Sequence, residues 1–181
     1  IEPRARSLET HHKQVEEAYA GQRVGMNLHR VPMEQVTRGR LLADPGLLNP
    51  SFLFNVDLKV LKTAKAPIKS RQRVKLYLGT SVTNTLVVLM EKQILQPGET
   101  GLAQLRLMKP VAALPRDPFV ICPLNVHTVM GGGNVLEIPR EKFRGVKAQR
   151  SLPYLSALKS CDLVNCVGQF FDAHTDLLLV P

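Results

Sequence analysis

Seven basic side chains crowd residues 59–75, KVLKTAKAPIKSRQRVK, and no acidic residue lies among them. Strand alternation predicts that Lys59, Arg73 and Lys75 project from the polar faces of two strands in one hairpin-like stretch. The connecting loop would carry the remaining four cations, Lys62, Lys65, Lys69 and Arg71. Such a cluster can neutralise several phosphates, and aromatic side chains for base stacking are nearly absent nearby. The pattern favours contact with the backbone of a nucleic-acid duplex. An exposed basic loop without a partner is the alternative.

The excess of positive charge is concentrated in the same part of the chain. The formal net charge is +9, and residues 51–110 carry ten Lys or Arg against three Asp or Glu, a surplus of +7. A surplus gathered in one segment favours a polyanionic partner over mere solubility. A well-solvated basic domain is the alternative here too.

Arg23 stands at the mouth of a predicted strand in AYAGQRVGMNL, residues 18–28. Val24, Met26 and Leu28 alternate with small or polar residues, which is typical of a strand with one covered face. A guanidinium placed there could bind an anion or a carbonyl, or it could be an ordinary surface charge.

Two cysteine and histidine combinations could do chemistry, but neither has a supporting local pattern. Cys122 and His127 could form a thiol hydrolase pair, although a proline follows the cysteine directly. Cys161, Cys166 and His174 could bind zinc, although five residues of helix place the two thiols on different faces. Buried, unreactive thiols and no metal site are therefore predicted.

Glycine-rich phosphate-binding patterns are absent from the sequence. Neither G-x-x-x-x-G-K-[ST] nor a G-x-G-x-x-G after a strand occurs. The run GGG at 131–133 has no following helix or lysine, so we predict that it serves backbone geometry, through positive φ or close approach.

The periodicity divides the chain into three parts. Residues 1–45 contain short apolar runs (PRARSLET, QRVGMNL, RLLA), a turn at HH and a brief helical turn in VPMEQVTRG, as in part of a small barrel. After a Pro- and Gly-rich connection at 44–51, residues 52–137 alternate strongly and predict five or six strands in a closed or nearly closed antiparallel barrel, with a turn at 97–100.

Residues 138–181 change to helical spacing from about position 147. A first helix is predicted to begin near Ser151, with Pro153 in its first turn. An apolar stripe over 163–171 predicts a second helix. The joint at 138–150, rich in basic residues and proline, is the expected hinge.

Composition adds three bounds. Hydrophobic residues make up 44% of the chain, which is enough for a packed core. Three cysteines form no disulfide framework, and no apolar run approaches the roughly 20 residues that span a bilayer. A cytoplasmic protein without a membrane partner is expected.

Longer motifs resemble translation factors. SLETHHKQVEEAYAGQRVGMNL and RGRLLAD are similar to the second half of domain II of translational GTPases related to elongation factor Tu. GETGLAQLRLMKPVAALPRDPFVI and TVMGGGNVLE resemble domain III of the selenocysteine-specific elongation factors (the SelB family). The resemblance implies a mainly β fold with a small α part: two translation-factor β-barrel pieces, at 1–45 and 52–137, then a helical linker and the start of a winged-helix domain at 138–181.

The resemblance also implies a function. The full protein would deliver selenocysteyl-tRNA to the ribosome at recoded stop codons, and further winged helices would read an mRNA hairpin. GTP and magnesium are implied for a GTPase domain outside this chain. The chain itself is then expected to bind tRNA and to couple the GTPase body to the mRNA-binding arm, without being an enzyme.

Only one site residue follows from the resemblance. Arg23 matches a family arginine of the aminoacyl pocket, where a cation would favour an ionised selenol over a serine hydroxyl. Cys122 departs from the pattern, since many relatives have an arginine there. A general elongation or initiation factor is the alternative family. The helical continuation beyond the barrel disfavours it, because elongation factor Tu ends with domain III.

Overall fold

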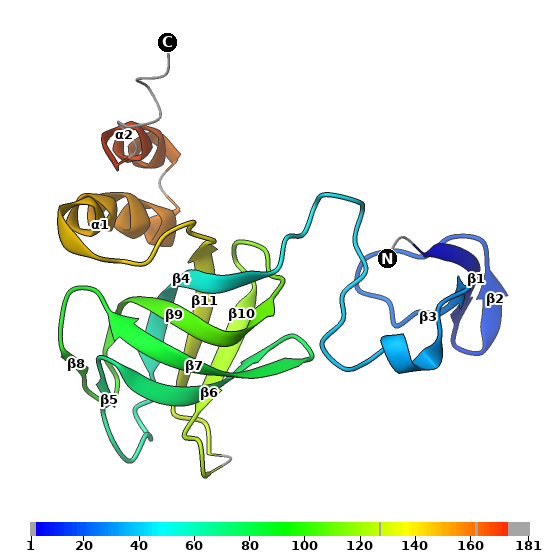
Figure 1. The fold of residues 1–181 in the computed structure, drawn as a ribbon, viewed down its shortest axis with the longest axis horizontal. Coiled ribbons are helices and arrows are strands. Elements are labelled where there is room, and N and C mark those ends of the chain that lie inside the picture. The colour runs from blue at the N-terminus through cyan, green and yellow to red at the C-terminus, as the bar shows by residue number, and fades with distance from the viewer. Residues whose placement is uncertain (1–2, 127, 162, 174–181) are drawn as a thin grey trace.

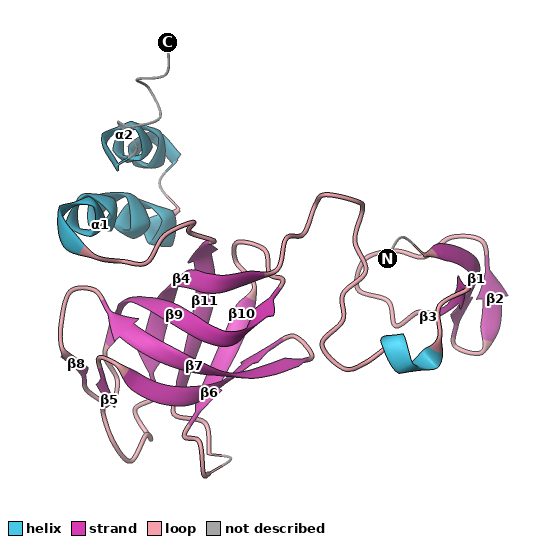
Figure 2. Ribbon diagram, in the orientation of Figure 1, coloured by secondary structure: helices cyan, strands magenta, loops and turns pink. Residues whose placement is uncertain are grey.

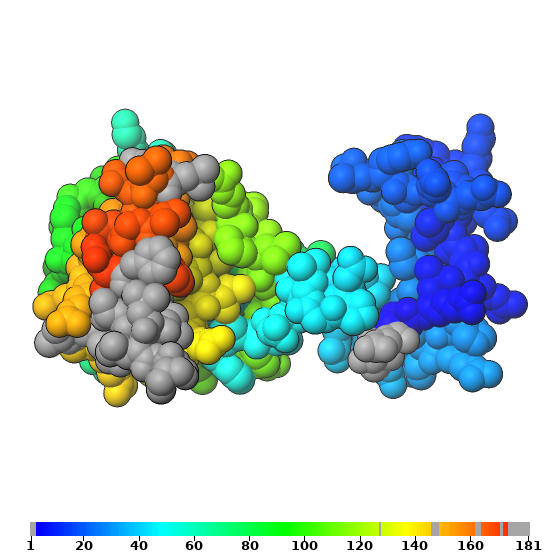
Figure 3. Space-filling view, turned by 90° about the horizontal axis from the view of Figure 1, so that it is seen from above, coloured from blue at the N-terminus to red at the C-terminus, as the bar shows by residue number. Residues whose placement is uncertain are grey.

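The computed structural model describes residues 3–126, 128–161 and 163–173. Figure 1 shows a small N-terminal sheet, a barrel and two helices along the chain. The mainly β fold class with two short C-terminal helices is confirmed. In the space-filling view of Figure 3, the N-terminal lobe is joined to the barrel by a narrow stretch of chain.

The N-terminal sheet has three antiparallel strands in the order β2-β1-β3. Their bounds, and those of a short 3₁₀ turn, are β1 Arg4–Thr10, β2 Lys13–Val15, β3 Gly25–His29 and η1 Met33–Gln35. The predicted turn at HH joins β1 to β2, with φ of 50° at His11 and 61° at His12. Positive φ at both central residues matches the twist of a two-residue hairpin.

The predictions for this part are only partly correct. The helical turn is present as η1, but the apolar run RLLA forms no strand, and Leu41 and Leu42 are exposed. Their side chains have no second sheet layer to cover them, so apolar character alone does not order a strand here.

The barrel is closed, as predicted. Six strands pair in the ring order β10-β11-β4-β9-β7-β6, and β5 and β8 form a separate two-stranded sheet beside it (Figure 2). The strands are β4 Ser51–Val60, β5 Ile68–Lys69, β6 Gln72–Leu78, β7 Ser81–Leu89, β8 Ile94–Leu95, β9 Thr100–Val111, β10 Pro118–Cys122 and β11 Gly131–Glu137.

Alternation along each strand fills the barrel interior. Phe54, Val56, Leu58 and Val60 of β4 are fully buried and meet the inward residues of the other strands. Closure gives every strand two neighbours, so the barrel has no open edge. The predicted turn at 97–100 leads into β9, where the Glu99 N–H donates to the carbonyl of Gln96 at 3.0 Å.

The three consecutive glycines lie inside β11 rather than before it. A Cβ at Gly131 would lie 2.6 Å from the Lys59 carbonyl oxygen, and one at Gly132 or Gly133 would meet the carbonyl of Phe119 or Asp57 still more closely. The close-approach prediction is therefore confirmed at all three positions. None of them has a positive φ.

Two helices follow the barrel, α1 Gly145–Ser160 and α2 Leu163–Ala173. The first begins six residues before the predicted start, so Pro153 lies in its interior and not in its first turn. The basic and polar residues ahead of the leucines are good helix formers, and the leucine spacing did not reveal them. Leu155 and Ala157 are buried, whereas Val164 and Val167 of the predicted apolar stripe on α2 are exposed.

In the described part of the chain, neither helix combines the length and the hydrophobicity needed to cross a membrane.

Candidate nucleic-acid interface

The seven predicted cations do not form one patch. Lys59 is exposed on β4, whose neighbours are β11 and β9, while Arg73 and Lys75 point outward from β6, whose neighbours are β10 and β7. In a ring of six strands, β4 and β6 stand opposite each other. The prediction of a single hairpin is therefore wrong. Local alternation identifies a strand's outward face, but strand order is decided by partners further along the chain.

The loop between these strands presents the middle of the cluster. Lys62 and Lys65 are exposed, and Lys69 projects from β5. Two apolar contacts hold this loop against the barrel: Ile68 is fully buried, and Ala64 packs against the core. The loop is therefore a fixed platform at one end of the barrel, with its lysines in solvent.

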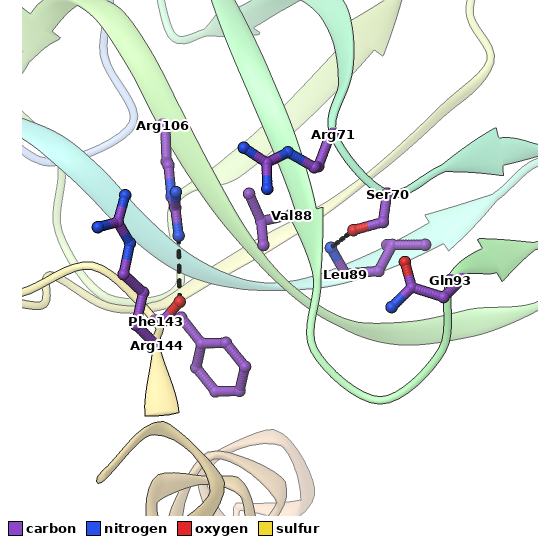
Figure 4. A pocket seen from close by; sticks show the side chains of 8 residues that line it. All are labelled: Ser70, Arg71, Val88, Leu89, Gln93, Arg106, Phe143 and Arg144. Atoms are coloured by element: carbon purple, nitrogen blue, oxygen red, sulfur yellow. Dashed lines mark hydrogen bonds between the residues drawn. The ribbon is translucent and has the colours of Figure 1, made fainter. Parts of the chain in front are cut away.

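Arg71 belongs to a different location, a pocket between the barrel and the start of α1. It follows β5 with φ of 67°, and its N–H donates to the Val87 carbonyl at 2.6 Å. The cavity measures about 310 Å³. Its lining is shown in Figure 4: Ser70, Arg71, Val88, Leu89, Gln93, Arg106, Phe143 and Arg144.

A buried glutamine connects this pocket to the segment that precedes α1. Gln104 is 1% exposed. Its Nε2 donates to the Asn55 side chain and to the Glu141 carbonyl, both at 3.2 Å. Its Oε1 accepts from Arg106 Nε at 3.0 Å and from the Phe143 N–H at 2.9 Å. The expected hinge at 138–150 is thus tied to the barrel at two of its backbone positions.

Arg106 completes the attachment and lies half-buried in the pocket wall. Its Nη2 donates to the Phe143 carbonyl at 3.1 Å. Burial lowers the pKa of Arg106, and the nearby positive charges of Arg144 and Arg71 lower it further. The pocket therefore concentrates positive charge in partly desolvated surroundings.

Two of these pocket arginines, Arg106 and Arg144, are absent from the sequence-based set. Arg106 lies in the alternating run AQLRLM, where it has the pattern of an ordinary outward residue. Arg144 precedes a helix whose start the leucine spacing did not reveal. A basic residue on a strand beside Gln104, followed by a basic joint, is the only signal that the sequence offered.

Arg23 lies where the sequence placed it, two residues before β3, and it lines a second concavity. This cavity of about 510 Å³ is bounded by Glu9, His11, His12, Arg23, Val24 and Gly25. Arg23 is exposed, and the His12 Nδ1 lies 3.7 Å from a carboxylate oxygen of Glu9. The hairpin turn of the N-terminal sheet therefore brings two histidines to the same hollow as Arg23.

The cysteines show no arrangement for catalysis among the described residues. Cys122 is buried at the end of β10, and His127 lies outside the described residues. Cys161 is exposed at the end of α1 and Cys166 on α2 is only half-buried, so the prediction of buried thiols is wrong for both. Cys161 accepts a hydrogen bond from Arg116 Nη2 at 2.9 Å. No group of three or more metal-ligating side chains lies together in the described residues, and His174 falls outside them.

Comparison with known proteins places the barrel in a family of translation factor domains. Residues 55–142 match the family model described as the selenocysteine-specific elongation factor, beta-barrel domain. A selenocysteine-specific elongation factor from Desulfomicrobium baculatum is 28% identical over 162 residues, which cover 89% of this chain and 26% of that protein. The chain thus spans about a quarter of the length of this relative.

The barrel therefore belongs to the beta-barrel domains of selenocysteine-specific elongation factors, as the sequence motifs predicted. The remainder of the chain is similar to a piece of the same kind of translation factor. The matched interval begins within β4, runs through β11, and includes Glu141, whose carbonyl accepts from Gln104.

Proposed function

We propose that this chain binds selenocysteyl-tRNA within a GTP-dependent elongation factor that delivers it to the ribosome at recoded stop codons. The family of the barrel is the observation that carries the proposal. In the same proposal, GTP and magnesium are bound elsewhere in the full protein. The two helices would form the start of a winged-helix domain. An mRNA hairpin would be read by further winged-helix modules of the full protein.

The tRNA backbone would bind the loop platform and one flanking wall of the barrel. Lys62, Lys65 and Lys69 are exposed, and buried Ile68 anchors the loop that carries them to the barrel. Exposed cations on an anchored loop suit contacts to phosphate oxygens. The walls that carry Lys59 and the pair Arg73 and Lys75 face opposite directions, so one RNA helix contacts at most one of them.

Filter binding of a tRNA to variant chains tests this arrangement. Replacing all three loop lysines with alanine should weaken binding and reduce the salt slope by roughly one for each lost phosphate contact. Either R73A/K75A or K59A should add to that loss, but not both. An unchanged salt slope in the loop variant would rule out the phosphate role.

Arg23 would recognise the aminoacyl group. Its cation lines a hollow large enough for a side chain, and an ionised selenol carries the negative charge that a seryl group lacks. In the full-length protein, Arg23→Ala should reduce the preference for selenocysteyl-tRNA over seryl-tRNA, and Arg23→Lys should restore part of it. Equal loss for both ligands would mean that Arg23 only supports the fold.

A further inference from the structure

Three arginines meet in the pocket at the joint between barrel and α1. Arg71 follows β5, Arg106 lies on β9, and Arg144 is the residue that precedes the first turn of α1. Figure 4 shows their guanidinium groups gathered on one side of the pocket. Within the described residues, no ion pair joins any of the three to a carboxylate.

Most of the hydrogen-bonding capacity of these side chains is unused. Arg106 has five N–H groups, and described residues accept hydrogen bonds only from its Nε and one Nη2 position. Arg71 and Arg144 use their side chains in no hydrogen bond within the described residues. Like charges held close together repel, so the arrangement gains most from an anion that several guanidinium groups share.

The rest of the lining suits a compact anion. Ser70 and Gln93 add polar groups to the lining, and Val88, Leu89 and Phe143 add apolar surface. Apolar surface excludes water, which strengthens charge-assisted hydrogen bonds. The N-terminus of α1, a 16-residue helix with no acidic residue in its first turn, begins directly after Arg144.

We propose that this pocket binds a phosphate group through Arg71, Arg106 and Arg144, and that the bound phosphate fastens the joint before α1 to the barrel. Resting on the proposed function, the inference assigns the phosphate to the backbone of the bound RNA. Arg71 and Arg106 come from the barrel and Arg144 from the joint, so a shared phosphate bridges the two. RNA binding would thereby be coupled to the position of the helices.

The test compares two charge-matched variants of the chain. R71N/R144Q removes two pocket cations, and asparagine tolerates the positive φ at position 71. K13Q/K109Q removes two exposed cations outside both the pocket and the proposed RNA-binding surface. Thermal unfolding is followed with and without inorganic phosphate at constant ionic strength.

At phosphate concentrations about twenty times Kd, the melting temperature of the unmodified chain should rise by about 4 °C. K13Q/K109Q should show the same rise, and R71N/R144Q should show none. If R71N/R144Q does not fold, Arg144→Gln alone replaces it. This single variant should fold, because Arg144 has no structural hydrogen bond among the described residues. It should weaken phosphate binding at least about threefold, because one pocket cation is lost. Equal shifts in all proteins, or no shift in any, would overturn the proposal.

Hydrogen exchange with an RNA duplex then identifies the source of the phosphate. Protection of the Phe143 amide by RNA in the unmodified chain, and not in R71N/R144Q, supports a backbone phosphate. If RNA binds without that protection, the pocket phosphate does not come from the RNA backbone, and a free phosphate-bearing ligand is its source. If RNA does not bind at all, the proposed function fails, whereas the phosphate titration still decides whether the pocket is an anion site.

Discussion

The barrel and the N-terminal sheet are built from similar short, alternating strands, yet only the barrel has a buried core. Phe54, Leu58 and Ile121 are fully buried in the barrel. No described residue in the range 3–50 is buried, and Tyr19 and Met26 are 68% and 45% exposed. Apolar alternation is therefore not sufficient for a core. Closure of the strands around a common interior supplies the second face that buries each side chain.

The segments on the two sides of the barrel also differ in how they attach to it. On the C-terminal side, buried Gln104 binds the joint before α1. On the N-terminal side, two exposed hydrogen bonds and one half-buried one join Arg38 and Gly39 to Thr80 and Ser81, each at 3.2 Å. Exposed hydrogen bonds compete with water and contribute little. We therefore expect the barrel and the joint to behave as one stable unit, with the sheet contributing far less.

The largest difference between the two regions is expected when one apolar side chain is removed from each. Phe54→Ala leaves a cavity in the barrel and should lower the free energy of unfolding by about 4 kcal/mol. Leu28→Ala, at the one half-buried residue of the otherwise exposed β3, should lower it by less than about 1 kcal/mol. Urea unfolding followed by far-UV circular dichroism measures both. Equal losses would show that the sheet has a core of its own.

A second test uses one strand glycine from each region. Gly133→Ala drives a methyl group into the backbone of β4 at Asp57 and should cost about 3 kcal/mol. Gly25→Ala places its Cβ 3.7 Å from Glu9, an ordinary contact, and should be neutral or slightly stabilising. The same unfolding measurement applies. A tolerated Gly133→Ala would contradict the close packing of β11 against β4.

Much of the fold follows from local patterns in the sequence. Alternation over 52–137 is enough to predict a closed barrel, because inward residues at every second position demand a shared interior. The role of the glycine run is also predictable, because three residues without side chains in a row indicate a close approach between backbones. The start of α1 is not predictable from leucine spacing, because its first two turns contain no leucine.

The candidate site is less accessible to such reasoning. The lysines of one sequence cluster separate onto opposite walls because strand order is a long-range property. Conversely, Arg71, Arg106 and Arg144 are distant in sequence and meet only in the folded chain. Arg23 could be placed before a strand, but its proximity to His11 and His12 depends on the pairing of β1 with β3.

A third test compares the two attachments of the barrel. Gln104→Leu leaves the Phe143 N–H and the Glu141 carbonyl without their partner and should cost about 2 kcal/mol. Thr80→Val removes one exposed contact to Gly39 and should cost less than about 0.5 kcal/mol. Hydrogen exchange should rise across 141–145 only in Gln104→Leu. A similar rise at Gly39 in Thr80→Val would show that both attachments are equally firm.

The smallest expected effect concerns one carboxylate from each region. Glu99, beside β9, accepts from the Gln96 N–H at 2.8 Å and pairs with Lys92 at 3.0 Å, and these contacts, the backbone bond first, lower its pKa. A lowered pKa stabilises the fold above the unfolded pKa, and this stabilisation is lost as pH falls through the folded pKa. Glu99→Gln should therefore lower the melting temperature slightly at pH 7 and leave it unchanged in strong acid. Glu9→Gln removes only an exposed 3.7 Å contact with His12 and serves as the control. A deficit of Glu99→Gln that persists in acid would point to lost packing, because both side chains are then uncharged.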